Sequence, residues 1–268
     1  MTFDLGLEAT DDPLRWRLPL RRVLMTAGDF LYGGAGLAAA VAALEGTTGR
    51  PLVWATAQYL SFARLPGALD LCLTLSVTGR HTTQGRCVVS DEAGQEILVA
   101  LATLGSRPLE VAGSWAVRPD VRPVSETRSY VPEAVVGTVH EALDMRLAQG
   151  MTRRQLLRGR PHENSGGRAA FWLRLPGGRG VPTGADLAMV GDVVPSGFAA
   201  ASGQPITGNS LDNTVRVASL VETEWVLADV RIHSITGGFG QGTAHLWAED
   251  GTLLGTASQS SVVRQPPV

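Results

Sequence analysis

The sequence contains no lysine; all 23 basic residues of this 268-residue chain are arginine. This absence excludes chemistry that needs a lysine amine, such as a Schiff base, attachment of pyridoxal phosphate or the lysine of a P-loop. Histidine is also scarce, and its positions lack the spacing of metal ligands. The five histidines are His81, His140, His162, His233 and His245. We therefore expect neither a metal ion nor an organic cofactor.

Charge is low as well. Charged residues make up 18% of the chain and hydrophobic residues 44%, which is typical of a globular protein. The net charge of −2 gives no reason to expect nucleic acid or a membrane as a partner. There is no bilayer-length apolar run and no signal-peptide pattern, so a cytoplasmic protein is the expectation. Cys72 and Cys87 lie in apolar runs, where we expect both to be small buried side chains.

The two halves of the chain repeat each other. Residues 84–107 and 241–264 align without a gap at one offset (241 − 84 = 157). The identities that anchor this alignment are Gln84 with Gln241, Gly94 with Gly251, and Arg107 with Arg264. A duplicated unit that packs against its own copy creates an interface, and binding sites tend to lie at such interfaces.

Each half is predicted to contain a short strand, a helix of small side chains and four further strands. In the first half the strands are expected at residues 14–20, 53–62, 69–78, 82–90 and 96–104, and the helix at 33–44, closed by Gly46. In the second half the strands are expected at 170–175, 210–219, 224–234, 240–248 and 253–263, and the helix at 184–194. The small side chains of the first helix allow a curved antiparallel sheet to approach it closely.

These elements divide the chain. We predict an N-terminal half at residues 1–110, a proline-containing linker at 111–135 and a C-terminal half at 136–268 that carries the polar site. Residues 136–149 are expected to form a strand that leads into the second half, and residues 153–167 a loop. The arginines of that loop, from Arg153 to Arg160, either contact the phosphates of a CoA-type substrate or form a solvated surface.

The chain resembles the acyl-CoA thioesterase II (TesB-like) family over roughly residues 14–265. Five short motifs in the right order carry the resemblance: Tyr32-Gly33-Gly34, Phe171-Trp172-Leu173-Arg174, Gly191-Asp192, Ser210-Leu211-Asp212, and a closing strand from Gly251 through Gln259 to Arg264. The resemblance implies an α+β double hot-dog fold, in which two antiparallel sheets each wrap a central helix and join as an intramolecular pseudo-dimer. Association of such chains through sheet edges into a homo-oligomer is compatible with this fold.

The family holds a water against a thioester with an aspartate, a threonine or serine, and a glutamine. The matching residues are Asp192, Ser210 and Gln259. The repeat places them opposite Ala42, Thr56 and Ala102, at offsets of 150, 154 and 157, which favours one site built on the second half. A rival alignment pairs Gly28-Asp29 with Gly191-Asp192 and needs a nine-residue deletion (163 − 154). For the carbonyl oxygen, we expect donors at the start of the first helix, among Gly33, Gly34 and Ala35.

Each of these residues also has a structural interpretation. Asp192 suits a helix cap, Ser210 a turn and Gln259 a solvent-facing strand position. Three departures from the family, Ala35 for glutamine, Asn213 for histidine and Ser260 for glutamate, permit an altered substrate preference or weak activity.

The resemblance implies a hydrolase that releases fatty acid and CoA from acyl-CoA, with a place in fatty acid metabolism. One alternative is a non-catalytic acyl-binding protein. The other is a hot-dog hydratase or dehydratase, although no histidine neighbours Asp192 in the sequence.

Overall fold

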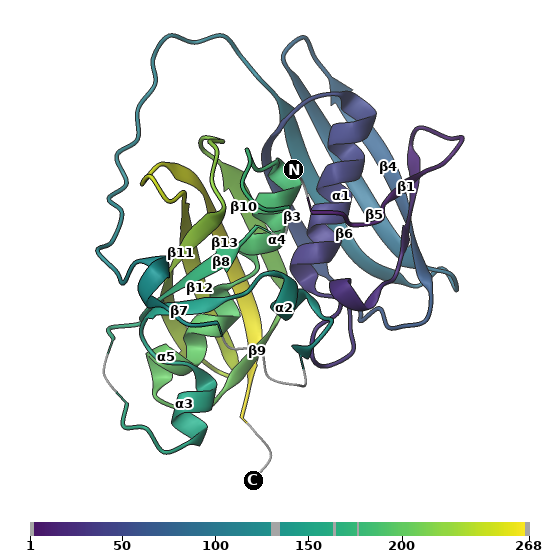
Figure 1. The fold of residues 1–268 in the computed structure, drawn as a ribbon. Coiled ribbons are helices and arrows are strands. Elements are labelled where there is room, and N and C mark those ends of the chain that lie inside the picture. The colour runs from purple at the N-terminus through teal and green to yellow at the C-terminus, as the bar shows by residue number, and fades with distance from the viewer. Residues whose placement is uncertain (1–2, 130–134, 163–164, 176, 266–268) are drawn as a thin grey trace.

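The computed structural model describes residues 3–129, 135–162, 165–175 and 177–265, and its two halves have the same core order of elements (Figure 1). The first half contains β1 (Glu8–Ala9), β2 (Arg15–Pro19), the 3₁₀ turn η1 (Arg22–Leu24), α1 (Gly33–Thr48), β3 (Leu52–Tyr59), β4 (Ala68–Thr78), β5 (Thr82–Asp91) and β6 (Glu96–Gly105). The linker contains the 3₁₀ turn η2 (Val124–Glu126). The second half contains α2 (Val139–Ala142), β7 (Arg146–Gln149), α3 (Arg153–Leu157), β8 (Arg168–Arg174), α4 (Gly184–Gly191), η4 (Val194–Gly197), α5 (Phe198–Ser202), β9 (Thr207–Ser210), β10 (Asp212–Val217), β11 (Trp225–Thr236), β12 (Phe239–Trp247) and β13 (Leu253–Arg264).

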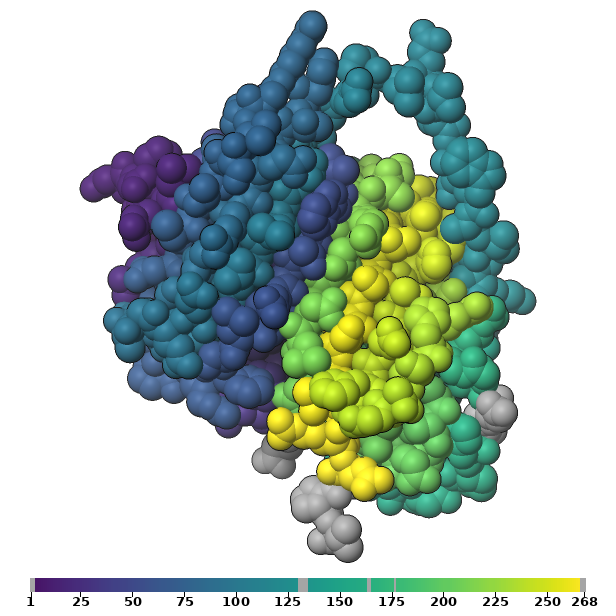
Figure 2. All heavy atoms as spheres, turned by 180° about the vertical axis from the view of Figure 1, so that it is seen from behind, coloured from purple at the N-terminus to yellow at the C-terminus, as the bar shows by residue number. Residues whose placement is uncertain are grey.

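The strands form one continuous antiparallel sheet. Its order is β1-β2-β4-β5-β6-β3-β10-β13-β12-β11-β8-β7, with β9 paired to β13. The two half-sheets therefore have mirrored order and meet at β3 and β10, where Thr56 lies opposite Thr214. The hydroxyls of these two threonines are 2.7 Å apart. This pair marks the centre of a pseudo-twofold arrangement, and Figure 2 shows the two halves meeting along one line on the outer face.

The concave side of each half-sheet holds its helix (Figure 1). α1 is buried along most of its length, and its small residues let strands approach closely. At Gly85 the small residue is instead on the sheet: an added Cβ on this β5 residue would lie 2.7 Å from the side chain of Leu44 in α1. A bulkier helix would hold the sheet further away, so the alanine-rich composition is a packing requirement.

Both helices begin where predicted, at Gly33 and Gly184, but both predicted C-terminal ends were wrong. α1 continues through Gly46 to Thr48, because Gly49 (φ 64°) supplies the left-handed residue that ends it. α4 stops at Gly191 rather than at residue 194. Asp192 leaves the helical conformation (φ −81°, ψ 55°). Pro195, three residues further on, has no backbone N–H to donate and so cannot extend α4. The early end of α4 turns Asp192 toward α1.

Three smaller expectations also need correction. The expected strand at residues 136–149 consists of α2 followed by the short β7. The expected loop at 153–167 begins with α3, whose first turn is fixed by a capping box between Thr152 and Gln155. Cys87 is buried as expected, whereas Cys72 faces outward from β4 and is exposed.

The linker covers part of the sheet's outer face. After arching away from the body (Figure 1), it brings Val121 and Val124 against a second apolar cluster that contains Trp172, Trp225 and Trp247. The Trp172 indole donates a hydrogen bond to the backbone carbonyl of Arg122 (2.9 Å). Within the described ranges, no helix is both long and apolar enough to cross a membrane.

Candidate active site

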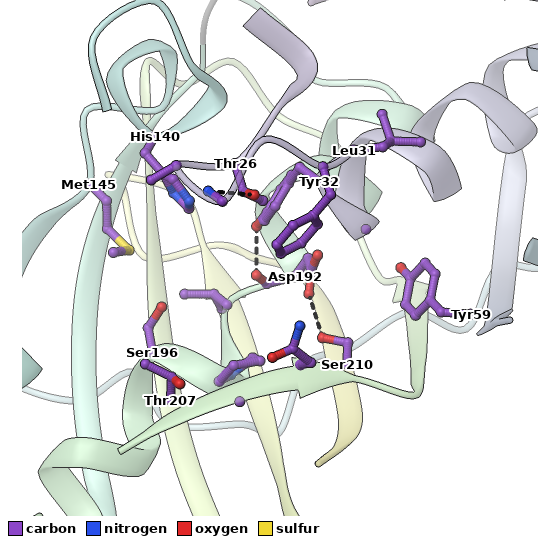
Figure 3. A pocket seen from close by; sticks show the side chains of 18 of the residues that line it. Thr26, Leu31, Tyr32, Tyr59, His140, Met145, Asp192, Ser196, Thr207 and Ser210 are labelled. Carbon is purple, nitrogen blue, oxygen red and sulfur yellow. Dashed lines mark hydrogen bonds between the residues drawn. The ribbon is translucent and has the colours of Figure 1, made fainter. Parts of the chain in front are cut away.

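Asp192 lies where the ends of the two central helices meet. α1 and α4 run antiparallel, so the N-terminus of α1 faces the C-terminus of α4. The Gly34 amide donates a hydrogen bond to Asp192 Oδ2 (2.7 Å), and the Tyr32 hydroxyl donates to the Asp192 backbone carbonyl (2.5 Å; Figure 3). The carboxylate of the second half thus caps the helix of the first half, where the helix dipole favours negative charge.

Ser210 and Gln259 approach the other carboxylate oxygen. The Ser210 hydroxyl donates to Asp192 Oδ1 (3.3 Å), and the Gln259 side-chain amide donates both to the same oxygen and to Ser210 Oγ (3.0 Å). The Val194 amide donates to Gln259 Oε1 (3.0 Å), which turns the Gln259 nitrogen toward Asp192. The structure therefore brings all three predicted residues into one cluster.

Neighbouring backbone contacts hold the two strands of this cluster in place. Asp212, two residues after Ser210, accepts a hydrogen bond from the amide of Ser260, the residue after Gln259 (2.7 Å). Gln259 is only 2% exposed, so it does not face solvent. Asp192 terminates α4 and does not cap a helix of its own half at the N-terminus. Asp192 and Gln259 are thus buried, Ser210 is partly buried, and the three side chains orient one another.

The electrostatics favour a carboxylate that can accept a proton. Burial raises the pKa of Asp192 above its ordinary value, and the hydrogen bonds from Gln259, Gly34 and Ser210 partly oppose that rise. A carboxylate with a raised pKa is a stronger base than one in water, yet these donors keep its charged form accessible. The arrangement suits a general base.

The start of α1 has fewer free donors than the sequence suggested. The Gly34 amide is bonded to Asp192, and the buried Ala35 amide donates to the Tyr32 carbonyl (3.0 Å). Among the described residues, the Gly33 amide has no hydrogen-bond partner. A Cβ on Gly33 would lie 2.8 Å from Asp192 Oδ2 and 3.0 Å from the Tyr59 hydroxyl, so only glycine fits. Of the three amides predicted at the start of α1, only that of Gly33 is without a hydrogen-bond partner among the described residues.

A cavity of about 380 Å³ opens beside this cluster, at the junction of the two halves. Its size lies within the usual range of small-molecule sites. Most of its wall is apolar, with contributions from both halves: Phe30, Leu31, Phe62, Met145, Leu173 and Ile206. Asp192 and Ser210 lie in the same wall (Figure 3). An acyl chain and a polar reacting group can therefore be held side by side.

Sequence reasoning assigned no role to two other residues of this cavity. His140 packs edge-on against Tyr32 with ring centroids 5.8 Å apart, and burial lowers the pKa of its imidazole. Tyr59 has a buried hydroxyl beside the buried Asn213 side chain, and burial raises its pKa well above the ordinary value. Both come from segments distant from Asp192 in the chain, and no local pattern pairs them with it.

The first half contains a counterpart of the site without its polar pair. Glu45, near the end of α1, accepts a hydrogen bond from the Leu52 amide (2.8 Å) and interacts with the Gly184 amide at the start of α4. Thr56 is paired with Thr214, which puts Leu52, rather than Thr56, in the position equivalent to Ser210. A carboxylate and a helix amide are thus present in both halves, whereas the serine and glutamine occur in one.

The rival alignment is not supported by the structure. Asp29 has a positive φ of 58°, and its exposed side chain forms an ion pair with Arg22. It does not occupy a position equivalent to that of Asp192. No group of three or more histidine, cysteine, aspartate or glutamate side chains in the described part of the chain is placed to hold a metal ion.

Comparison with known proteins identifies the family. Residues 124–263, more than half of the chain, match the family model of the acyl-CoA thioesterase C-terminal domain. The chain belongs to the acyl-CoA thioesterase family. The predicted family is therefore confirmed, and none of the curated proteins matches the chain.

Solved structures show the same fold over nearly the whole length of this thioesterase-family chain. A provisionally named thioesterase from Novosphingobium aromaticivorans is 29% identical, with 97% of this chain and 99% of that one covered and a TM-score of 0.83. A hot-dog protein of unknown function from Alicyclobacillus acidocaldarius is 19% identical (97% and 96% covered, TM-score 0.83). Acyl-CoA thioesterase II from Mycobacterium marinum is 16% identical (98% and 97% covered, TM-score 0.74). These matches confirm the double hot-dog fold; the last two show fold alone.

Proposed function

We propose that this chain hydrolyses acyl-CoA thioesters to a free fatty acid and CoA, with Asp192, Ser210 and Gln259 positioning the attacking water. The observation that carries the proposal is the convergence of these three side chains in the wall of one largely apolar cavity. Membership of the thioesterase family supports the reaction class. The reaction would belong to fatty acid metabolism.

The geometry suggests how each group acts. A water beside Asp192 gives a proton to the carboxylate while its oxygen bonds to the thioester carbon, and Ser210 and Gln259 orient that water. The carbonyl oxygen becomes negative and needs donors, for which the Gly33 amide is the candidate. When the tetrahedral intermediate collapses, the carbon–sulfur bond breaks. The CoA sulfur then takes the proton from Asp192, which restores the carboxylate.

An acyl-CoA series assayed with a thiol-detecting reagent tests the proposal. We expect CoA release for at least one chain length from short to long, at a rate well above that without protein. Absence of release for every chain length, together with measurable acyl-CoA binding, would instead support the non-catalytic binding protein.

One observation bears on the hydratase alternative, because His140 lines the same cavity as Asp192. A hydratase needs both groups beside the same carbon–carbon double bond, because water adds its hydroxyl to one carbon and a proton to the next. Figure 3 shows Tyr32 between His140 and Asp192, and the Tyr32 hydroxyl is bonded to the Asp192 carbonyl. This arrangement favours hydrolysis. Loss of enoyl-CoA absorbance without thiol release would reverse the assignment.

The activity should depend on pH through Asp192. Because burial raises the pKa of this carboxyl, its deprotonated form becomes the major one at a higher pH than for an ordinary aspartate, whose pKa is 3.8. We expect kcat/KM to rise with pH through an inflection above 3.8 and then to level off. A pH profile of kcat/KM with one acyl-CoA substrate measures it. An inflection at or below pH 3.8 would show that burial does not raise the pKa of Asp192 in the working enzyme.

A further inference from the structure

We infer that the free edge of β9 and the Arg153 guanidinium bind the CoA part of the substrate, with the pantetheine arm along β9 and a phosphate on Arg153. This inference rests on the proposed function, because it takes acyl-CoA as the ligand. It assigns the CoA moiety to one wall of the cavity and so leaves the acyl chain to the other.

β9 borders the cavity with its backbone. Four consecutive residues, Thr207 to Ser210, all line the cavity. Side chains alternate between the two faces of a strand, so consecutive residues can share a cavity only where the strand presents its edge. One edge of β9 pairs with β13, and the other has no strand partner within the described ranges. Unpaired backbone groups are therefore available to a ligand that carries amides.

The pantetheine arm matches this edge in chemistry. It contains two secondary amides, which can donate to and accept from an extended backbone as a peptide does. The side chains of Ser196, Thr207 and Asn209 also line this part of the cavity. They add hydrogen-bonding groups beside the strand. A plain acyl chain could satisfy none of these groups, so this wall suits CoA better than a fatty chain.

The length also fits. Ser210 contacts Asp192 at one end of β9, and Arg153 Nε donates a hydrogen bond to the Pro205 carbonyl just before the other end (2.9 Å). Five residues separate Ser210 from Pro205 (210 − 205 = 5), a span of about 16 Å in an extended chain. By its number of bonds, the arm from sulfur to phosphate is equivalent to roughly four residues of extended backbone, or about 14 Å. A thioester at Asp192 would place the first phosphate near Arg153.

The Arg153 side chain is positioned to bind an anion. It lines the cavity at the start of α3, where the Thr152–Gln155 capping box fixes the backbone. Its Nε is held by Pro205, and among the described residues its terminal nitrogens form no ion pair. A guanidinium held in this way presents its remaining donors to a phosphate.

The test compares Arg153→Gln with Arg158→Gln, a matched control. Arg158 is an exposed arginine that directly follows the last residue of α3 and does not line the cavity. Each variant is assayed with an acyl-CoA and with the same acyl group on N-acetylcysteamine, a thioester without phosphates. We expect Arg153→Gln to raise KM for acyl-CoA about tenfold or more with kcat unchanged. The N-acetylcysteamine ester should be hydrolysed as by the wild type, and Arg158→Gln should resemble the wild type with both substrates.

Calorimetric titration with free CoA separates this site from the proposed reaction. Weaker CoA binding by Arg153→Gln, in a protein that hydrolyses no thioester, would support the CoA site and overturn the hydrolysis. Wild-type CoA binding by Arg153→Gln would overturn the site. An equal rise in KM for both thioesters would also overturn it, as would an effect confined to acyl groups that bear a terminal carboxylate.

Discussion

Replacing Asp192 with asparagine is expected to lower kcat for acyl-CoA hydrolysis by about a thousandfold, within the range usual for loss of a general base. Asparagine has nearly the shape of aspartate but cannot take a proton from water. The one side-chain oxygen of asparagine can accept from the Gly34 amide in place of Oδ2. Its NH2 group then faces the Ser210 hydroxyl, which can accept a hydrogen bond instead of donating one, while the Gln259 amide loses its acceptor on Oδ1. Steady-state kinetics with the best acyl-CoA substrate measures the loss.

The fold should survive this substitution. Because the pKa of Asp192 is raised in the folded protein, the carboxyl's contribution to stability is complete below its ordinary pKa and is lost as pH rises through the folded pKa. Asparagine carries no charge to bury, which offsets the acceptor that the Gln259 amide loses, so at pH 7 the Tm of Asp192→Asn should be close to that of the wild type. A lower Tm together with lost secondary structure would mean that inactivity reflects unfolding.

Glu45→Gln supplies the matched control. Glu45 is the counterpart carboxylate of the first half, its pKa is raised by burial, and it accepts from the Leu52 amide. It does not line the cavity. We expect Glu45→Gln to keep wild-type turnover. If both substitutions lowered kcat equally, the loss would come from the helix junction as a whole, and Asp192 would not be the base.

Replacing Gly34 with alanine is expected to lower the free energy of unfolding by about 2 kcal/mol and to reduce kcat at least tenfold. The added methyl would lie 2.7 Å from the Met189 carbonyl oxygen and 2.9 Å from Asp192 Cβ. The carbonyl belongs to the α4 backbone and cannot rotate away, so the two helices must separate. That separation moves Asp192 from Ser210 and Gln259. Urea unfolding and the thioester assay measure the two effects.

Gly46→Ala tests whether the effect is specific to the junction of the helices. Gly46 lies in the same helix, and its added methyl would meet only the outer end of the Trp16 ring, at 3.0 Å. A ring end can shift, and alanine favours helix more than glycine does. We expect a change in unfolding free energy of less than about 0.5 kcal/mol and unchanged kcat. Comparable losses in both variants would contradict the close approach of α1 and α4.

Much of the fold could be predicted because its signals are local. Alternation of apolar residues marked most strands, and the alanine-rich composition of residues 33–44 marked a helix wrapped by a sheet. The C-terminal ends of the helices were harder to predict. Gly46 and Gly49 are both glycines that could end α1, but only Gly49 takes the left-handed conformation that ends it. Capping depends on backbone conformation, which composition does not specify. The domain boundaries at 110 and 135 stay a prediction.

The candidate site was predictable only in part. Asp192, Ser210 and Gln259 followed from the family motifs, and the structure clusters them. Their catalytic roles stay a prediction. The repeat suggested Ala42 as the counterpart of Asp192, but packing gives that position to Glu45 from the next helical turn. Helices of unequal length cannot be aligned by one offset, so the sequence misplaced this residue. Arg153 was grouped with a surface loop because its contact with Pro205 spans 52 residues.

By itself, the sequence determined that this protein has two like halves, small-residue helices under antiparallel strands, and a polar set confined to the second half. The tertiary structure decided which residues meet. The Gly34 amide and Asp192 are 158 residues apart and are joined only because α1 and α4 pack antiparallel across the β3–β10 junction. Periodicity records which face of an element is buried, whereas the meeting of two helix ends depends on the packing of both halves together.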